Sequence, residues 1–178
     1  MGNASVKPQQ VSLRDIAELA GPNFHFAVRF ILYLRNGPDV RANSGSDRMI
    51  GVEEHWEFVN RFLLEDRGLW YIVKTGGDYA GYVRIDREGE QEGFSSTRQG
   101  IVSIALLKDK RGKGIGSQAI KLASVRAFNK GFKALKAIVQ PANIASQRAF
   151  EIAGFRYART DERGYYVLEK RRQGEAAL

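Results

Sequence analysis

The chain has 178 residues, of which 43% are hydrophobic, and carries a formal net charge of +8. This length suits one domain, and the hydrophobic fraction is sufficient for a buried core and too high for a disordered chain. The absence of cysteine excludes a disulfide scaffold, a cysteine nucleophile and a thiolate metal site. No apolar run reaches the roughly 18 residues of a membrane span, so no membrane-spanning segment is expected. We expect a cytoplasmic protein that binds no metal and no membrane.

The basic charge by itself would suit nucleic acid, a membrane surface or a small polyanion. A compact block of five or more basic residues is absent, and the nearest run is Lys170-Arg171-Arg172. We therefore expect no nucleic-acid partner, while a small anionic ligand and a merely solvated basic surface both stay open. One domain is expected over residues 1–178, with flexible tails at 1–10 and 172–178.

The N-terminal third of the sequence predicts one strand and two helices. Val11 to Leu19 alternates loosely and is interpreted as a first strand. Apolar residues at helical spacing predict helices over 24–34 and 53–64. Asn36-Gly37-Pro38-Asp39 has the residues of a turn, and the polar stretch 40–50 is predicted to be a loop.

The middle of the sequence predicts a hairpin, a central strand and a helix. Two β-rich runs, 69–74 and 79–86, flank a glycine-containing turn. The nearly continuous apolar run 101–107 predicts a central strand buried on both faces. A basic, glycine-rich loop over 110–116 follows it, and helical spacing predicts a helix over 115–128.

The C-terminal part predicts a strand over 134–139, a helix over 143–153 and a final hairpin from 155–159 and 165–170. Gly154 stands just past the helix, where glycine is favoured. No internal repeat and no linker is visible. One mixed α/β domain accounts for the chain.

The glycine-rich loop is the clearest functional feature of the sequence. It contains Gly112, Gly114 and Gly116, with Arg111 and Lys113 interleaved. The first turn of a helix has unpaired backbone N–H groups and the positive end of the helix dipole, and glycines let a phosphate approach those amides. The alternative is a tight turn without a ligand, which the alternation of glycines and cations disfavours.

Two common phosphate-binding motifs do not fit this loop. In a Walker A loop, Ser or Thr would follow the lysine, but Lys113 is followed by Gly114. Gly114-x-Gly116-x-x-Ala119 matches the dinucleotide pattern, but the next strand ends in Gln140-Pro141 and lacks the acidic residue that holds a ribose. A nicotinamide or flavin dinucleotide is therefore not expected.

Two motifs together resemble the GNAT superfamily of N-acetyltransferases. Arg111, Gly114 and Gly116 match that family's motif of Arg or Gln, two residues, Gly, one residue, then Gly or Ala. The segment 143–155, with the sequence NIASQRAFEIAGF, is similar to the family's second motif and follows in the expected order. The resemblance covers about Val11 to Lys170. It implies a single α+β domain with a mixed, mostly antiparallel central sheet flanked by helices.

The resemblance also implies an acetyl-coenzyme-A-dependent transfer to a primary amine, with acetyl-CoA as co-substrate. The loop amides would hold the pyrophosphate, and the strand ending at Leu106-Leu107 would pair with the pantetheine arm and supply an N–H for the oxyanion. Asn143 would hydrogen-bond the cofactor, with Ser146 and Arg148 facing its phosphate or adenine end. The implied cofactor-binding residues are Leu106, Leu107, Arg111, Gly112, Lys113, Gly114, Ile115, Gly116, Ser117, Asn143, Ser146 and Arg148.

The sequence departs from the family at the residues for proton transfer. Many members have Tyr where this chain has Phe150, and others have Glu where Gln99-Gly100 stand. An ammonium with a pKa near ~10 must lose its proton before attack, so another group or ordered water is needed. The candidate residues are Ser103, Asp86, His55 and Tyr157. Each also has a plain structural interpretation, as a strand, turn, helix-surface and core residue respectively.

The acceptor is expected to bind near the N-terminal helices. The stretches 34–41 and 50–55, and the strand segment 83–87, are similar to N-acetyltransferases that act on nucleotide-linked amino sugars of the pseudaminic acid pathway. The implied substrate-binding residues are Arg35, Asn36, Asn43, Glu54, His55 and Arg84. Arg35, Arg41, Arg48 and Arg84 would meet the diphosphate, and Trp56 or Tyr82 would stack on a base or sugar.

Two other functions stay open at this point. The chain could acetylate a protein N-terminal amine, for which an open groove with acidic residues is expected rather than a basic pocket. It could also bind acetyl-CoA without turnover, because the usual Tyr is missing. The expected partner is a small-molecule amine, and the protein is expected to be a monomer or a homodimer.

Overall fold

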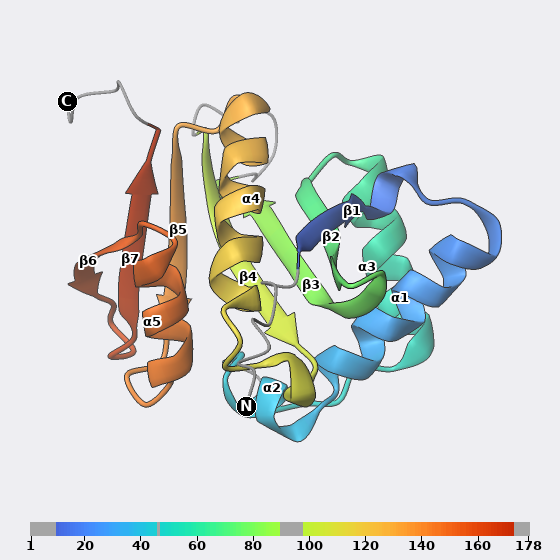
Figure 1. Ribbon diagram of the computed structural model, residues 1–178, viewed down its shortest axis with the longest axis horizontal. Coiled ribbons are helices and arrows are strands. Elements are labelled where there is room, and N and C mark those ends of the chain that lie inside the picture. The colour runs from blue at the N-terminus through green and yellow to red at the C-terminus, as the bar shows by residue number, and fades with distance from the viewer. Residues whose placement is uncertain (1–9, 46, 90–97, 173–178) are drawn as a thin grey trace, which may run out of the picture.

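The computed structural model describes residues 10–45, 47–89 and 98–172. They form a seven-stranded sheet of order β1-β2-β3-β4-β5-β7-β6, flanked by helices (Figure 1). All neighbouring strands are antiparallel except β4 and β5. The predicted single α+β domain with a mixed, mostly antiparallel sheet is therefore confirmed. The predicted tails lie outside the described residues, apart from Gln10 and Arg172.

The strands are β1 (Val11–Asp15), β2 (Gly68–Thr75), β3 (Asp78–Arg87), β4 (Gln99–Leu106), β5 (Ala134–Val139), β6 (Arg156–Thr160) and β7 (Tyr166–Arg171). The helices are α1 (Gly21–Arg35), α2 (Pro38–Ala42), α3 (Val52–Leu64), α4 (Ile115–Asn129) and α5 (Ile144–Ile152), with short 3-10 turns at Ile16–Glu18 and Lys108–Lys110. Every helix and hairpin predicted from the sequence is present. In the described part of the chain, none of the helices combines the length and apolarity that spanning a membrane requires.

Two hydrophobic cores lie on opposite faces of the sheet. Leu69, Tyr71 and Val73 of β2 pack with α4 and α5, and the alternate residues Trp70 and Ile72 pack with α1 and α3. Strand β2 is buried along nearly its whole length because both of its faces are covered. Figure 1 shows α4 and α5 side by side in front of the sheet. We call the opposite face, which contains Trp70 and Ile72, the α1/α3 face.

The N-terminal region differs from the sequence-based prediction in two places. The first strand ends at Asp15, four residues early, because the Asp15 carboxylate accepts a hydrogen bond from the Ala17 N–H and starts a 3-10 turn. The predicted turn and loop after Asn36 contain a short helix, α2, with Pro38 at its start. Proline is favoured in the first helical turn because its missing N–H would have no partner there.

The prediction that strand 101–107 is buried on both faces is wrong. Val102 and Ala105 are buried, but Ile101, Ile104 and Leu106 are partly exposed. The reason is that β4 pairs with β5 only through Gln99 to Ile101, opposite Ala134 to Lys136. Beyond that point the two parallel strands part, and no described strand pairs with β4 on its β5 side. We call this place, where the strands separate, the fork.

Candidate active site

The glycine-rich loop turns directly into helix α4. Gly112 and Gly114 have φ angles of +70° and +74°, a region that residues with a Cβ rarely adopt. Gly114 is the N-cap of α4, and no side chain among the described residues caps the helix start. The Ser117 hydroxyl donates to the Gly114 carbonyl at 3.0 Å and so leaves the amides free. The first N–H groups of the helix therefore face an exposed loop and can bind an anion.

Gly116 brings the two sequence motifs together. Its φ is ordinary, and a Cβ at this position would lie 3.5 Å from Leu106 Cδ1 and 3.9 Å from Ala149 Cβ. The start of α4 therefore packs against β4 on one side and against α5, which carries the second motif, on the other. An alanine would fit in this contact, in agreement with the Gly or Ala of the family motif.

Of the two residues at the end of β4, Leu106 and Leu107, one directs its backbone N–H toward the fork. The Leu107 N–H donates to the Ala80 carbonyl at 2.9 Å, so it is bound within the sheet and is not available for an oxyanion. Hydrogen-bonding directions alternate along an antiparallel strand, so the N–H and C=O of Leu106 point away from β3, toward the fork. Of the two candidate donors in the sequence, the geometry favours Leu106.

Arg111 joins the loop to helix α2. Its Nε and Nη2 donate to the Leu106 carbonyl at 3.0 and 2.8 Å, and its Nη1 pairs with the Asp39 carboxylate. This contact holds the pKa of Asp39 below its usual range. On the other side, Gln140, just after β5, donates to the Ala42 carbonyl at 2.9 Å. Helix α2 therefore connects the ends of β4 and β5, and we call it the strap.

The second motif mainly builds helix α5. Asn143, which we expected to hydrogen-bond the cofactor, is the N-cap of α5, and its Oδ1 accepts from the Ser146 N–H at 3.1 Å. Arg148 is exposed on the same helix. Phe150 is only 3% exposed and packs edge-to-face on Phe155, with 5.1 Å between the ring centroids. Phe150 is a core residue, and it has no hydroxyl that could transfer a proton as the usual tyrosine would.

The α1/α3 face brings the predicted acceptor residue Arg84 together with two candidate proton-transfer residues, Ser103 and Asp86. Trp70 of β2, Arg84 of β3 and Ser103 of β4 are direct neighbours across the three strands and therefore share this face. Asp86 lies one step further along, opposite Ile101, where β4 still pairs with β5. Ser103 and Asp86 therefore lie close to the base of the fork.

Arg84 is held firmly by its neighbours. Its guanidinium stacks over Trp70 and Phe58, at 5.0 and 5.1 Å from the ring centroids, and its Nε pairs with Asp86 at 3.0 Å. This arrangement fixes the Asp86 carboxylate near Ser103. The partners Trp70 and Phe58 were not identified as site residues from the sequence, because only the strand register brings them to Arg84.

His55 does not fit either role proposed for it from the sequence. It is 3% exposed, and its Nε2 lies 3.0 Å from the Val28 carbonyl, so it ties α3 to α1. Burial lowers the pKa of this imidazole. Its interpretation as a helix-surface residue is wrong, and its burial argues against proton transfer with a substrate.

The depressed pKa of His55 predicts how stability changes with pH. Below about pH 6.5 the unfolded chain takes up a proton on this imidazole that the folded protein excludes, so stability falls as pH falls. We expect the free energy of unfolding to drop by on the order of 1 kcal/mol more in the wild type than in His55→Gln between pH 7.5 and 5.5. Urea denaturation at both pH values measures this. His25→Gln, on the exposed His25 of α1, is the control; equal slopes for all three proteins would contradict the prediction.

Other predicted acceptor residues form hydrogen bonds or ion pairs within the protein. Asn36 and Ile50 exchange two hydrogen bonds of 2.9 Å, which close the chain between α1 and α3. Asn43 donates to the Asp39 carbonyl at 2.8 Å within the strap, and Glu54 pairs with Arg48. Tyr82 is buried under α1, so it cannot stack on a base as expected.

The position of Tyr157 contradicts its interpretation as a core residue. Tyr157, interpreted as a core residue, is 57% exposed on the edge strand β6, and its hydroxyl lies 2.9 Å from Thr160 Oγ1. Edge strand β6 is separated from β4 by β7 and β5, so Tyr157 is not part of the fork. Within the described ranges, no group of three or more His, Cys, Asp or Glu side chains could hold a metal ion.

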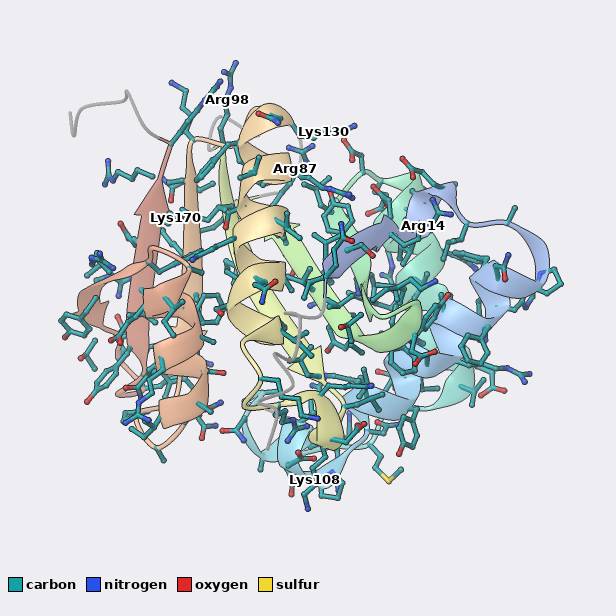
Figure 2. All side chains as sticks on the ribbon, in the orientation of Figure 1. Arg14, Arg87, Arg98, Lys108, Lys130 and Lys170 are labelled. Atoms are coloured by element: carbon teal, nitrogen blue, oxygen red, sulfur yellow. The ribbon has the colours of Figure 1, made fainter. Side chains whose placement is uncertain are left out.

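The basic residues are not concentrated at the fork. In Figure 2, Lys108 lies at the end of the molecule with the glycine-rich loop, whereas Arg87, Arg98 and Lys130 lie at the opposite end. These labelled basic residues therefore lie at both ends of the molecule. What distinguishes the fork is geometry, namely free helix amides next to two parting strands.

Comparisons with known proteins agree with this geometry. Residues 37–155 match the model of the family described as "Acetyltransferase (GNAT) family". No curated protein matches the sequence. The spermidine N-acetyltransferase from Vibrio cholerae, solved with CoA and spermine, is similar with a TM-score of 0.73 and 18% identity, covering 90% of this chain and 93% of that chain.

Two further solved structures have the same fold. Aminoglycoside acetyltransferase AAC(6')-Ib, solved with coenzyme A and kanamycin, has a TM-score of 0.72 at 18% identity, covering 92% of this chain and 96% of that one. A domain from Methanocaldococcus jannaschii DSM 2661 has a TM-score of 0.72 at 17% identity, covering 92% and 99%. At this identity the structures support the fold, whereas the family match includes the glycine-rich loop and the whole second motif. Because that match extends over more than half of the sequence, the chain belongs to the acetyltransferase (GNAT) family.

Proposed function

We propose that this acetyltransferase transfers the acetyl group of acetyl-CoA to a primary amine of a nucleotide-linked amino sugar. The amides from Gly112 to Ser117 would hold the pyrophosphate, and the partly exposed apolar side chains of β4 would lie along the pantetheine arm. The family match and the solved relatives that contain coenzyme A support the donor. The acceptor is inferred from the charges around the α1/α3 face.

The observation behind the acceptor is that four acidic side chains of α2, α3, β3 and the segment between α2 and α3 are paired with arginines. Each of four carboxylates pairs with an arginine: Asp39 with Arg111, Asp47 with Arg41, Glu54 with Arg48, and Asp86 with Arg84. A polycation such as spermine, or a protein N-terminus, would need free carboxylates there. An anionic acceptor such as a nucleotide sugar would not.

The chemistry needs alignment and two proton transfers: the ammonium loses one proton before attack, and the departing coenzyme A thiolate gains one as the nitrogen loses its second proton. When bound, acetyl-CoA supplies a thioester carbonyl that an uncharged amine can attack. Holding the acceptor in place supplies a large part of the rate enhancement, and the Leu106 N–H, which points toward the fork, could donate to the oxyanion. On the α1/α3 face, the Asp86 carboxylate could take the ammonium proton, directly or through water, and the Ser103 hydroxyl could relay it.

A thiol-release assay tests the proposed acceptor. The purified protein is incubated with acetyl-CoA and with UDP- or dTDP-linked amino sugars, spermidine, kanamycin, or a peptide with a free N-terminus. We expect a nucleotide-linked amino sugar to give a kcat/KM at least tenfold above the others. A preference for spermidine, kanamycin or the peptide would overturn the acceptor. Tight binding of acetyl-CoA without thiol release from any amine would favour a non-catalytic binding protein.

The ion pair between the strap and Arg111 predicts a modest effect of Asp39→Asn on the KM for acetyl-CoA. The Asp39–Arg111 pair is half exposed, and such pairs contribute up to about 1 kcal/mol. Because the pair orients Arg111 of the glycine-rich loop, we expect the KM for acetyl-CoA to rise by up to about fivefold with little change in thermal midpoint. Asp66→Asn, which breaks an exposed pair with Arg87 away from the fork, is the matched control. An equal change in both variants would contradict a role for the strap.

A further inference from the structure

Arg35 has a buried donor without a partner. It is the last residue of α1 and is partly exposed, but its Nη1 is buried and has no hydrogen-bond partner among the described residues. A guanidinium stays charged under all ordinary conditions and has five N–H donors. Leaving one of these donors buried and unpaired lowers the stability of the folded protein. The unpaired Nη1 of Arg35 is therefore not explained by a contribution to the stability of the folded protein.

The position of Arg35 connects it to the α1/α3 face. Helix α1 packs on β3 and β4, and its residues Ile31 and Leu34 share a core with Tyr82 and Ala105. The charges of Arg84 and Arg35 both act on the buried Tyr82 hydroxyl, whose pKa is raised by burial. Tyr82 is the direct neighbour of Ala105, which lies between Ile104 and Leu106 of the fork. Arg35 therefore lies on the side of the sheet where the acceptor is proposed to bind.

Four other arginines of this region have acidic partners. Arg41, Arg48, Arg84 and Arg111 are each paired with a carboxylate, as described above. Arg35 differs from them because no described carboxylate satisfies its Nη1. A cation kept in this way next to a substrate site is suited to an oxyanion that arrives with the substrate.

We propose that Arg35 forms an anion subsite that binds a phosphate or carboxylate group of the acceptor. This inference rests on the proposed function, because it assumes that the acceptor binds on the α1/α3 face. It deepens that function by assigning recognition of the acceptor's negative charge to one residue. The subsite is separate from the glycine-rich loop, which binds the diphosphate of the cofactor.

Binding of small anions to the coenzyme-A-saturated protein tests the subsite. Saturating coenzyme A fills the glycine-rich loop, so the probes pyrophosphate, UDP and glutamate report on a second anion site by calorimetry. We expect at least one probe to bind the wild type and to lose tenfold or more in affinity in Arg35→Gln. Arg29→Gln removes the same charge from an exposed position on the same helix and should leave the affinity unchanged. Binding of UDP or pyrophosphate supports a diphosphate as the source of the anion, and binding of glutamate supports a carboxylate.

Stability separates this role from a purely structural one. If Arg35 only supports the fold, Arg35→Gln should lower the thermal midpoint; if its unpaired donor serves a ligand, the midpoint should stay or rise while anion binding is lost. Arg35→Lys, which keeps the charge without the planar fork, should retain part of the affinity.

Failure of the subsite and failure of the proposed function look different. The subsite is overturned if no probe binds the coenzyme-A-saturated wild type, or if Arg35→Gln binds the probes as the wild type does. A normal kcat/KM of Arg35→Gln with a nucleotide-linked amino sugar would also overturn the subsite, while leaving the proposed function intact. Because calorimetry needs no turnover, it tests Arg35 even if no amine in the thiol-release assay is acetylated.

Discussion

Gly114→Asp is expected to lower the affinity for acetyl-CoA by about 100-fold or more, an energy of roughly 3 kcal/mol. Gly114 has a φ of +74° and is the N-cap of α4, so a side chain there strains the loop. The new carboxylate would also lie beside the free amides that attract a phosphate, and it would repel the pyrophosphate and compete for those amides. Calorimetric titration with acetyl-CoA measures the loss.

Gly164→Asp is the matched control for this substitution. Gly164 also has a positive φ, +82°, and has open space around it, but it lies in the turn between β6 and β7. The same residue change under the same backbone constraint should there reduce stability without reducing acetyl-CoA affinity. Normal affinity in Gly114→Asp, or an equal loss in both variants, would count against the glycine-rich loop as the cofactor site.

Gly81→Ala is expected to destabilise the protein by about 2–4 kcal/mol. A Cβ at Gly81 would lie 2.2 Å from the Ala105 carbonyl oxygen and 2.6 Å from Leu106 Cδ2. The first contact is with backbone, so it cannot be relieved by a side-chain rotation. The strand would have to shift just where β4 meets the fork. Urea denaturation of the variant measures the loss of stability, and thiol release measures the accompanying loss of activity.

Gly51→Ala shows what the same added methyl group does where there is room. Gly51 precedes α3, its φ is −69°, and no atom of the described residues lies within 4 Å of the place that the methyl group would occupy. We expect its unfolding free energy to stay within about 0.5 kcal/mol of the wild type. If Gly81→Ala left the unfolding free energy equally unchanged, the close approach of β3 to β4 would not be required for the position of the end of β4.

Much of the fold could be predicted because its elements are marked by short-range patterns. The 3.6-residue spacing of apolar residues in α4 and the glycine that follows it depend only on neighbours in the sequence. The same is true of the hairpin β2–β3. The two motifs that resemble the GNAT family are also local, so the loop Arg111 to Ser117 could be proposed as the cofactor site before any contact was known.

Prediction was less successful where a residue's role depends on a distant partner. His55 reads as a polar helix residue, but it is buried because Val28, 27 positions earlier, presents a carbonyl to it. Asp39 reads as part of a turn, but it pairs with Arg111, 72 positions later. Strand β4 is apolar throughout, and no local pattern indicates that β5 leaves it after three residue pairs.

The anion site at the start of α4 is thus determined by local sequence, because free amides at a glycine-rich helix start need only a few consecutive residues. The acceptor side is different, since it is assembled from α1, α2, β3 and β4, which are distant in sequence. Charge pairing among those elements neutralises most of their arginines and leaves the Nη1 of Arg35 without a described partner. Such selection among similar residues arises only when packing brings each side chain next to its partners, because burial and pairing are properties of contacts rather than of residue types.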